Sequence, residues 1–376
     1  MKPRRTFDAV VVGAGIVGAA CARELALNGL LVALCDANTY VGGGATAAGM
    51  GHLAVMDDSE AQFALTAYSQ RLWRELSPEL PAEAEYLSCG SLWVAADDEE
   101  HAEVERKFRF YTGRDLPVEI LGGKQLREAE PNLREGLVSA LRMPSDSVCY
   151  PPCAARYFAK VVTHRGGSLL LGQRAAAING GELVTEGGER LSTDLIVLAA
   201  GTAVTKLVDG LDIQPRKGHL VITDRYPGFL HHQLIELGYL KSAHSTTTDS
   251  VAFNAQPRAT GQILIGSSRQ FSREDPAVED HMLQKMLARA VHYMPRLAQL
   301  SALRTWTGFR AATRDKLPFI GVCPGHERVY LAAGHEGLGI STSLATARLI
   351  ADHIFHRESS IDRRPYEAAR VFAHHA

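Results

Sequence analysis

Two kinds of hydrophobic pattern run along the chain, and each predicts a different part of the fold. Short, nearly uninterrupted apolar runs occupy residues 7–12, 30–36, 194–201 and 329–334. Runs of this length, rich in Val, Ile and Leu and ended by Gly or Asp, predict β-strands. A helical pattern separates the first two and reaches Asn28, and Gly29 follows it, as is typical after a helix. Residues 7–36 therefore predict a strand–helix–strand unit.

Alternating apolar and polar positions dominate after residue 215. The stretches GHLVITD, HQLIELGYL, SVAFNA and GQILIGSS alternate in this way, which predicts an antiparallel sheet. A further strand with a glycine kink is expected at residues 87–97. Helices are expected at residues 59–76, where Ser59 and Gln62 have capping-box spacing, and at residues 275–295, up to Pro295.

Composition and charge are those of a globular protein and argue against nucleic-acid binding. The 376 residues are 46% hydrophobic and 22% charged, which is ordinary for a globular protein and predicts about two domains. The net charge is −2, and no basic tract is longer than Arg4–Arg5. Nucleic acid is therefore not an expected partner.

The six cysteines predict neither a disulfide framework nor a metal site. Cys21 and Cys35 lie in apolar runs and are expected in the core. Cys149 and Cys153 are close in sequence, but no further Cys or His cluster accompanies them, so no metal is expected.

The N-terminal stretch MKPRRTFDAVVV superficially resembles a signal peptide, but spaced glycines interrupt the apolar run that follows the basic residues. That run is also too short to span a membrane. We expect a cytoplasmic protein without a transmembrane segment.

The turn between the first strand and the first helix reads GAGIVG. Gly13, Gly15 and Gly18 have the G-x-G-x-x-G spacing, and Asp36 ends the second strand 21 residues after Gly15. In this motif the glycines permit the turn, the close approach of a pyrophosphate and the packing of helix on strand. The helix N-terminus attracts the phosphates, and the acidic residue accepts a hydrogen bond from a ribose hydroxyl. The unit predicts a dinucleotide site.

The stretch GGGATAAGMGH, residues 42–52, favours FAD over NAD. Its small residues let the backbone run close to a large flat ligand, whereas an NAD-binding domain would continue with another helix and strand. Near the C-terminus a second glycine turn, with Gly334, Gly337 and Gly339, precedes a helix. The N-terminus of that helix is expected to face an anionic group, and this suits the pyrimidine edge of a reduced flavin.

Five motifs occur in an order that resembles one enzyme family. GAGIVG…CD, ATAAGMG, LIVLAAG, WTGFRAATRDKLPFIG and AAGHEGLGI span both ends and the middle of the chain. Together they resemble the D-amino-acid oxidase family of FAD enzymes, which includes glycine oxidase and sarcosine oxidase. The resemblance implies non-covalent FAD and an α/β fold, in which a Rossmann-like FAD-binding domain carries an inserted α+β substrate domain with an antiparallel sheet. The FAD-binding domain is expected at residues 1–80, 145–212 and 310–376, and the substrate domain at residues 81–144 and 213–309.

The resemblance also implies which residues contact FAD. Some relatives attach the flavin through a cysteine just after the arginine of the GFR motif, but Ala311 and Ala312 stand there in this chain. The predicted FAD set is Gly13, Gly15, Ile16, Val17, Gly18, Asp36, Ala37, Ala45, Thr46, Ala47, Ala48, Gly49, Met50, Ala200, Gly201, Gly334, His335, Gly337, Leu338, Gly339 and Ile340.

Arg310, in the GFR motif, is the predicted substrate anchor. The resemblance implies that it holds a substrate carboxylate, and a guanidinium group matches a carboxylate in charge and shape. Burial of this charge among Trp306, Phe309 and Phe319 would be costly unless an anion meets it. The alternative role is a structural salt bridge. Arg314 and Asp315 are expected to form a pair that stabilises the next turn.

Other catalytic or substrate-binding candidates are His52, Tyr239, Asn254 and His335. His52 would face the substrate side of the flavin or pack as a structural histidine. His335 is expected to orient the second glycine turn rather than act as a base. Glycine oxidase has a carboxylate-binding tyrosine in the strand that reads VAFNAQPR here, and the matching position is about Asn254. Tyr239, His244 and Asn254 are therefore candidates for that contact.

Within the family, AAGMGHLAVMDDSEAQFAL and the chain length most resemble the flavoprotein subunit of D-hydroxyproline dehydrogenases. This resemblance implies oxidation of cis-4-hydroxy-D-proline to a cyclic imine, small redox partner subunits and an acceptor other than oxygen. Cys149 and Cys153 would face a partner or lie in the core. The alternatives are a stand-alone oxidase of glycine, sarcosine or a D-amino acid, an electron-relay subunit without a substrate site, and a nicotinamide-dependent dehydrogenase.

Overall fold

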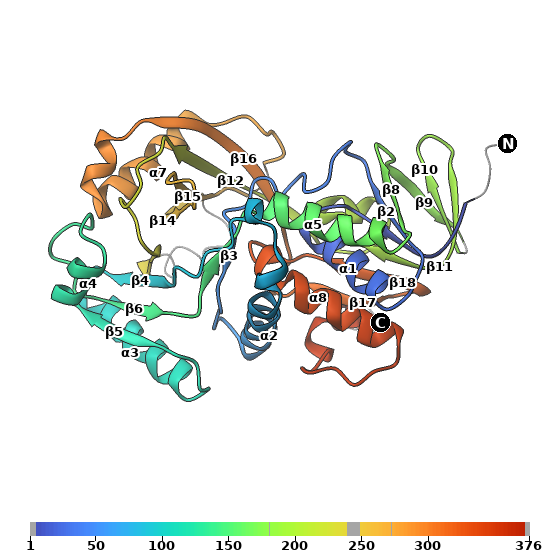
Figure 1. The fold of residues 1–376 in the computed structure, drawn as a ribbon, viewed down its shortest axis with the longest axis horizontal. Helices are drawn as coiled ribbons and strands as arrows, with labels where there is room; N and C mark the ends of the chain where they lie inside the picture. Colours follow the sequence, from blue (N-terminus) through green and yellow to red (C-terminus); the bar gives the residue numbers. More distant parts are fainter. Residues whose placement is uncertain (1–4, 180, 239–248, 272, 373–376) are drawn as a thin grey trace.

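The computed structural model describes residues 5–179, 181–238, 249–271 and 273–372. These residues form two large sheets, and the chain crosses between them several times (Figure 1). Tyr239 and His244 lie outside the described residues.

The first sheet contains the four apolar runs. Its main path is β17–β18–β11–β1–β2–β8, and β10 joins β9 to β11. Neighbouring strands from β18 to β8 are parallel, whereas β17 is antiparallel to β18. The bounds are β1 Arg5–Val12, β2 Val32–Asp36, β8 Ser168–Leu171, β9 Ala175–Asn179, β10 Glu182–Thr185, β11 Arg190–Leu198, β17 Phe319–Cys323 and β18 His326–Ala333.

Helices cover one face of this sheet (Figure 1). α1 packs between α5 and α8, and α2 packs against α8. Their apolar faces share one core with β1 and β2, and Cys149 and Cys153 are buried in it. The bounds are α1 Ile16–Leu27, α2 Glu60–Leu76, α5 Pro151–His164, α8 Gly339–Ile354 and α9 Ala369–Phe372. Ser59 caps α2 by accepting a hydrogen bond from the backbone N–H of Gln62 at 3.1 Å, as predicted.

The second sheet contains the alternating runs, in the order β16–β12–β15–β14–β13–β4–β6–β5. All its pairs are antiparallel except β13 with β4. The bounds are β4 Ser91–Ala95, β5 Glu119–Gly122, β6 Ser139–Met143, β12 Gln214–Thr223, β13 Gln233–Glu236, β14 Ser250–Pro257, β15 Ile263–Arg269 and β16 Ala302–Ala312. The other α-helices are α3 Asp98–Thr112, α4 Gly123–Ala129 and α7 Asp280–Tyr293, and the short strands β3 His52–Leu53 and β7 Ser147–Val148 pair with each other.

The predicted α/β class with a second, antiparallel sheet is confirmed. The assignment of the two sheets to two domains stays a prediction, and β16 continues across the boundary predicted at residue 310. Among the described residues, no helix combines the length and the apolar character that a membrane span needs. In the same part of the chain, no group of three or more His, Cys, Asp or Glu side chains is arranged to hold a metal ion.

The helix predicted at residues 275–295 begins later, at Asp280. Glu279 explains the difference because distant residues hold it in an extended conformation. Its backbone N–H donates to His219 Nε2 at 3.0 Å, and its carboxylate accepts from Lys217 Nζ at 2.9 Å. These tertiary bonds compete with helix formation before residue 280.

A buried ion pair fixes the segment between β3 and α2. The side chains of Asp57 and Lys107 are 1% and 2% exposed. Lys107 and Arg106 both donate to the Asp57 carboxylate, and Lys107 Nζ lies 4.9 Å from the centre of the Trp93 ring. The pair therefore anchors the neighbouring residues Met56 and Asp58 against the second sheet.

Replacing Lys107 with Met should lower the free energy of unfolding by about 3–5 kcal/mol, because it leaves a buried carboxylate with one cation fewer. Urea unfolding measures this change. The matched control is Lys124→Met, whose ion pair with Glu128 is exposed and should contribute less than about 1 kcal/mol. Equal stabilities of the two variants would contradict the interpretation.

Candidate active site

A cavity of about 910 Å³ lies between the two sheets. The turn after β1, residues 43–52 and the turn before α8 line one part of it, and β12, β14, β15 and β16 line another. Its volume is near the upper end of the range for small-molecule sites. We call the part beside the glycine turns the cofactor half and the part against the second sheet the substrate half.

The first glycine turn opens into the cofactor half. Of the predicted set, Gly13, Gly15, Ile16, Val17, Asp36 and Ala37 line the cavity. Gly18 does not, and a Cβ there would lie 1.8 Å from the Gly13 carbonyl oxygen. Its role is thus the close packing of α1 on the turn, as the motif predicts. Asp36 accepts hydrogen bonds from the backbone N–H groups of Ala14 at 2.5 Å and Asn38 at 2.7 Å.

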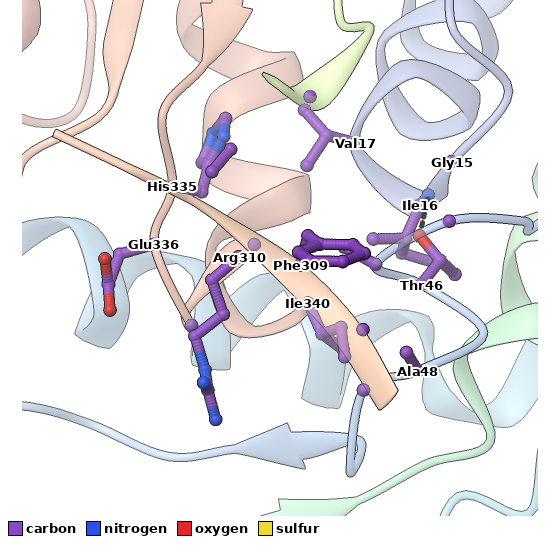
Figure 2. Close-up of a pocket in the computed structure, with 18 of the residues that line it drawn as sticks. Gly15, Ile16, Val17, Thr46, Ala48, Phe309, Arg310, His335, Glu336 and Ile340 are labelled. Atoms are coloured by element: carbon purple, nitrogen blue, oxygen red, sulfur yellow. Dashed lines mark hydrogen bonds between the residues drawn. The ribbon is translucent and has the colours of Figure 1, made fainter. Parts of the chain in front are cut away.

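The small-residue segment forms a neighbouring wall. Ala45, Thr46, Ala48, Gly49 and Met50 line the cavity, whereas Ala47 is exposed and does not. Thr46 Oγ1 accepts a hydrogen bond from Ile16 N–H at 2.9 Å, which ties the segment to the first turn of α1 (Figure 2).

The second glycine turn lines the same half with Gly334, His335, Gly337, Leu338, Gly339 and Ile340. Gly334 has φ +77°, and a Cβ there would lie 2.6 Å from Thr313 Cγ2. The N-termini of α1 and α8 therefore both open into one cavity, which suits a ligand with anionic groups at two places.

At the far end, Ala200 and Gly201 line the cavity as predicted, and residues 173–176, Glu186 and Lys206 join them. The sequence did not point to this second group. Residues 173–176 and Glu186 lie around β8 to β10, Lys206 follows β11, and none of them belongs to a motif. The pairing of β8 with β2 brings residues 173–176 near Asp36.

Arg310 lies in the substrate half, and its neighbours differ from those expected. Its guanidinium group lies over Gly218, where a Cβ would be 2.6 Å from Nη1, and Nη1 donates to the Ser268 carbonyl at 3.0 Å. Trp306 and Phe319 stack with other arginines, Arg304 and Arg370. Phe309 does line the cavity beside Arg310 (Figure 2).

The predicted pair of Arg314 and Asp315 is wrong. Arg314 pairs with Asp212, and Asp315 pairs with Arg370 at 2.6 Å. Both partners are far away in the sequence, so local spacing did not indicate them. Lys316, expected in the turn beyond, has φ +61° and lines the cavity.

The sequence motifs did not identify three charged residues that line the substrate half. Arg216, Arg269 and Glu336 line the cavity with Arg310. Arg216 Nη1 donates to Glu336 Oε1 at 2.7 Å, and both side chains are largely buried. The signal for Glu336 was its position in a glycine turn, and its φ of +52° is indeed one that glycine prefers.

His52 and Asn254 also line the cavity. Burial lowers the pKa of His52 to about 4, and its Nε2 has no hydrogen-bond partner among the described residues. Asn254 is buried, and within the same part of the chain its Oδ1 lacks a partner.

His335 Nε2 lies 3.0 Å from Oγ1 of Thr346 on α8, and the contact is buried. Burial lowers the pKa of His335 to about 3. The imidazole is therefore neutral at physiological pH and points into the protein, which agrees with a structural role.

The family model of FAD dependent oxidoreductases, abbreviated DAO, matches residues 8–353. The chain belongs to this DAO family. This membership confirms the family, the cofactor and the enzyme class that the motifs predicted.

Two relatives match the DAO chain over nearly its whole length. Glycine oxidase from Pseudomonas aeruginosa is 29% identical over 96% of this chain and 98% of its own. The hydrogen cyanide synthase subunit HcnC from the same species is 27% identical over 97% and 96%. The crystal structure of glycine oxidase from Geobacillus kaustophilus superposes with a TM-score of 0.87 at 27% identity, covering 96% of this chain and 98% of that one.

The residues of the cofactor half fit FAD. At Gly49 a Cβ would lie 2.6 Å from Ile340 Cδ1, and at Gly308 it would lie 2.1 Å from Ala48 Cβ. The glycines thus keep both walls free of side chains where a flat ring system needs room. The contacts of individual residues with FAD stay predictions.

The stability of the DAO protein should fall as the pH drops below 6.5. The pKa values of His52 and His335 are lowered to about 4 and about 3, whereas an unfolded chain titrates its histidines near 6.5. Between these values the unfolded chain binds more protons, so acid favours unfolding.

Replacing His335 with Gln should reduce this slope by up to about 1.4 kcal/mol per pH unit. Urea unfolding of the holoenzyme between pH 4.5 and about 7 measures it. His326→Gln is the control, since His326 is exposed, and its slope should match that of the unchanged protein. The same slope in the His335 variant would refute the assignment.

Proposed function

We propose that this protein oxidises cis-4-hydroxy-D-proline and is the flavoprotein subunit of a dehydrogenase. The coarse activity, FAD-dependent oxidation of an amino or imino acid, follows from the family and agrees with relatives named glycine oxidase. The choice of substrate rests on the substrate half of the cavity and on the motif resemblance.

Arg310 is the proposed carboxylate anchor. Its charge is held between Gly218 and Gly337 at the cavity wall. Glu336, a carboxylate whose charge acts on Arg310, is already paired with Arg216. A guanidinium group in such a place favours an anionic ligand.

The surroundings of Asn254 are the observation that supports a hydroxylated substrate. Its Oδ1 is buried at the cavity and has no partner among the described residues. Asn254 lies on β14, one strand beyond β15, on whose Ser268 carbonyl the Arg310 guanidinium rests. Neighbouring strands are about 4.8 Å apart, a separation that suits a ring with a carboxylate on one side and a hydroxyl on the other.

A substrate hydroxyl would donate to Asn254 Oδ1. Glycine or unsubstituted proline would leave this buried acceptor unsatisfied, at a cost of about 1–3 kcal/mol.

Bound FAD supplies the hydride acceptor for the carbon that carries the amine. The chain's own contribution is to hold the substrate. Arg310 fixes the carboxylate, Asn254 fixes the ring hydroxyl, and the apolar Ile235 and Trp93 line the cavity beside Asn254. Two fixed points on a rigid ring define which face and which carbon meet the cofactor.

Small redox partner subunits and an acceptor other than oxygen belong to the same proposal, as does a cytoplasmic location. The relative HcnC is named as a subunit of a larger enzyme, which supports a multi-subunit form. A stand-alone oxidase of glycine is the second candidate, favoured by the name of the other relative.

Replacing Arg310 with Ala should lower kcat/KM on the order of 10²–10³-fold, because a carboxylate would enter the site without its cation. Steady-state kinetics of the FAD-loaded protein measures the loss. Arg314→Ala, in the same motif but exposed, should keep near-normal activity. Near-normal activity of Arg310→Ala would end the assignment of the anchor.

Substrate identity is tested by anaerobic bleaching of the flavin with cis-4-hydroxy-D-proline, D-proline, L-proline, sarcosine and glycine. The first should bleach fastest, and Asn254→Leu should reduce its advantage over D-proline by roughly 10-fold. Preference for glycine or sarcosine would favour the oxidase, and bleaching by none would favour an electron-relay subunit. Slow reoxidation in air would support an acceptor other than oxygen.

A further inference from the structure

The strand pairing beneath Arg310 is irregular. β12 pairs with β15 at Val221 and Ile265, and the two chain segments pair again at Lys217 and Gln270. Between these two pairs, the three residues 218–220 of β12 face the four residues 266–269 of β15. One extra residue in one strand of an antiparallel pair is a β-bulge, and bulges are frequent next to active sites because they redirect the groups of their strand.

Ser268 lies in this bulge and accepts hydrogen bonds with two oxygens. Its hydroxyl oxygen accepts from the His219 backbone N–H at 2.9 Å, and its carbonyl oxygen accepts from Arg310 Nη1 at 3.0 Å. The first bond ties Ser268 to β12, and the second holds the guanidinium group over Gly218. A displacement of Ser268 would therefore move the guanidinium group of Arg310 as well.

This single bond directs the Arg310 side chain. Within the described part of the chain, the Ser268 carbonyl is the one hydrogen-bond acceptor of the guanidinium group. A guanidinium group has five N–H donors, so the others can meet a ligand. The direction in which they point depends on where the Ser268 carbonyl lies.

His219 reaches Ser268 from the reverse face of the sheet. Arg216, Gly218 and Leu220 of β12 line the cavity. Side chains alternate between the two faces of a strand, so Lys217 and His219 extend on the opposite face. Both are fully buried. His219 therefore acts on the cavity through the strand and not by contact with a ligand.

The imidazole of His219 has a defined tautomer. Its Nε2 accepts a hydrogen bond from the Glu279 N–H at 3.0 Å, and its Nδ1 lies 2.8 Å from Ser268 Oγ. Since Nε2 accepts, Nδ1 carries the proton and donates to Ser268 Oγ. Burial, and next the charge of Lys217, lower the pKa of His219, so the ring is neutral at physiological pH, as the bond from Glu279 requires.

Glu279 also closes the far end of the bulge. Its carboxylate accepts from Lys217 Nζ at 2.9 Å and from Gln270 Nε2 at 3.1 Å. The backbones of Lys217 and Gln270 exchange two further bonds, at 3.1 and 3.0 Å. The bulge is thus fixed by side chains at the place where regular strand pairing is interrupted.

We propose that His219 is a positioning residue, which holds Ser268 so that the Arg310 guanidinium group is oriented to receive a carboxylate. This role rests on the proposed function, in which Arg310 is the carboxylate anchor. A charged donor that is already oriented loses less freedom when the ligand binds, and its affinity is higher for that reason.

The test measures binding without turnover. Pyrrole-2-carboxylate, a flat ring acid that carries no hydrogen on its α-carbon, is titrated into the FAD-loaded protein while the flavin absorbance is followed. His219→Leu should weaken its binding roughly 10-fold, about the contribution of one hydrogen bond to a charged group. Pyrrole-2-carboxamide has a similar shape without the charge, and its affinity should change little.

Two further variants follow the proposed path. Ser268→Ala removes the hydroxyl group that receives both bonds from His219 and should cause a similar loss. It is the smaller change and carries the test if His219→Leu fails to load FAD. His219→Asn places an amide N–H near the position of Nδ1 and should keep most of the affinity.

Thr223→Val is the matched control. Thr223 is a buried residue of the same strand, and its Oγ1 accepts from the N–H of Ile263 on β15 at 3.0 Å. This is the same kind of bond between the same two strands, but at their other end. The variant should lower the melting temperature, because a buried N–H loses its acceptor, and should bind pyrrole-2-carboxylate normally.

A double-variant cycle separates positioning from a general structural role. If His219 acts through Arg310, His219→Leu should weaken binding in the unchanged protein and add nothing in the Arg310→Ala variant. Equal losses in both backgrounds would contradict the proposed path. A melting curve and the flavin spectrum show that each variant is folded and loaded.

Unchanged affinity of His219→Leu and Ser268→Ala, together with weakened binding by Arg310→Ala, would overturn the role of His219 and leave the anchor standing. A loss in Thr223→Val as large as that in His219→Leu would also overturn it. Normal binding by Arg310→Ala would overturn the anchor itself, and the role of His219 with it.

Discussion

The contact between residue 308 and Ala48 is the constraint on which the site depends. A Cβ at position 308 would lie 2.1 Å from that of Ala48, so only glycine lets β16 approach residues 43–52 this closely. Ala48 belongs to the wall of the cofactor half and Gly308 to the second sheet. The contact therefore sets the separation of the two walls. Arg310 lies two residues farther along β16, so its distance from the cofactor half is fixed by the same approach.

The two halves of the cavity present different groups to a ligand. The cofactor half presents helix N-termini and small residues, which suit a large anionic ligand that needs backbone contact and space. The substrate half presents the Arg310 guanidinium group, held over Gly218, which suits a small ligand oriented by a few strong, directional bonds. Met50 connects the halves, as its sulfur would lie 2.8 Å from a Cβ at Gly266 of β15.

Local motifs were predictable from the sequence, whereas pairings between distant residues were not. Gly13, Gly15 and Gly18 could be recognised because their spacing lies within six residues, although the atoms that require glycine at position 13 belong to Ala199. The predicted start of α7 was wrong because the observed start depends on the hydrogen bond from the Glu279 N–H to His219, some 60 residues away. Arg314 was given the wrong partner for the same reason. Arg269 was missed because strand order, which the sequence does not state, brings it beside Arg310.

The ion pair of Glu336 with Arg216 limits which single replacements this site tolerates. A left-handed backbone costs a non-glycine residue about 1–2 kcal/mol, and a buried carboxylate without a cation would cost more. Arg216 alone would in turn add a third positive charge beside Arg269 and Arg310. Each member of the pair is thus unfavourable without the other. The two side chains therefore form one unit, and a replacement at either position alone would leave the other charge buried without its partner.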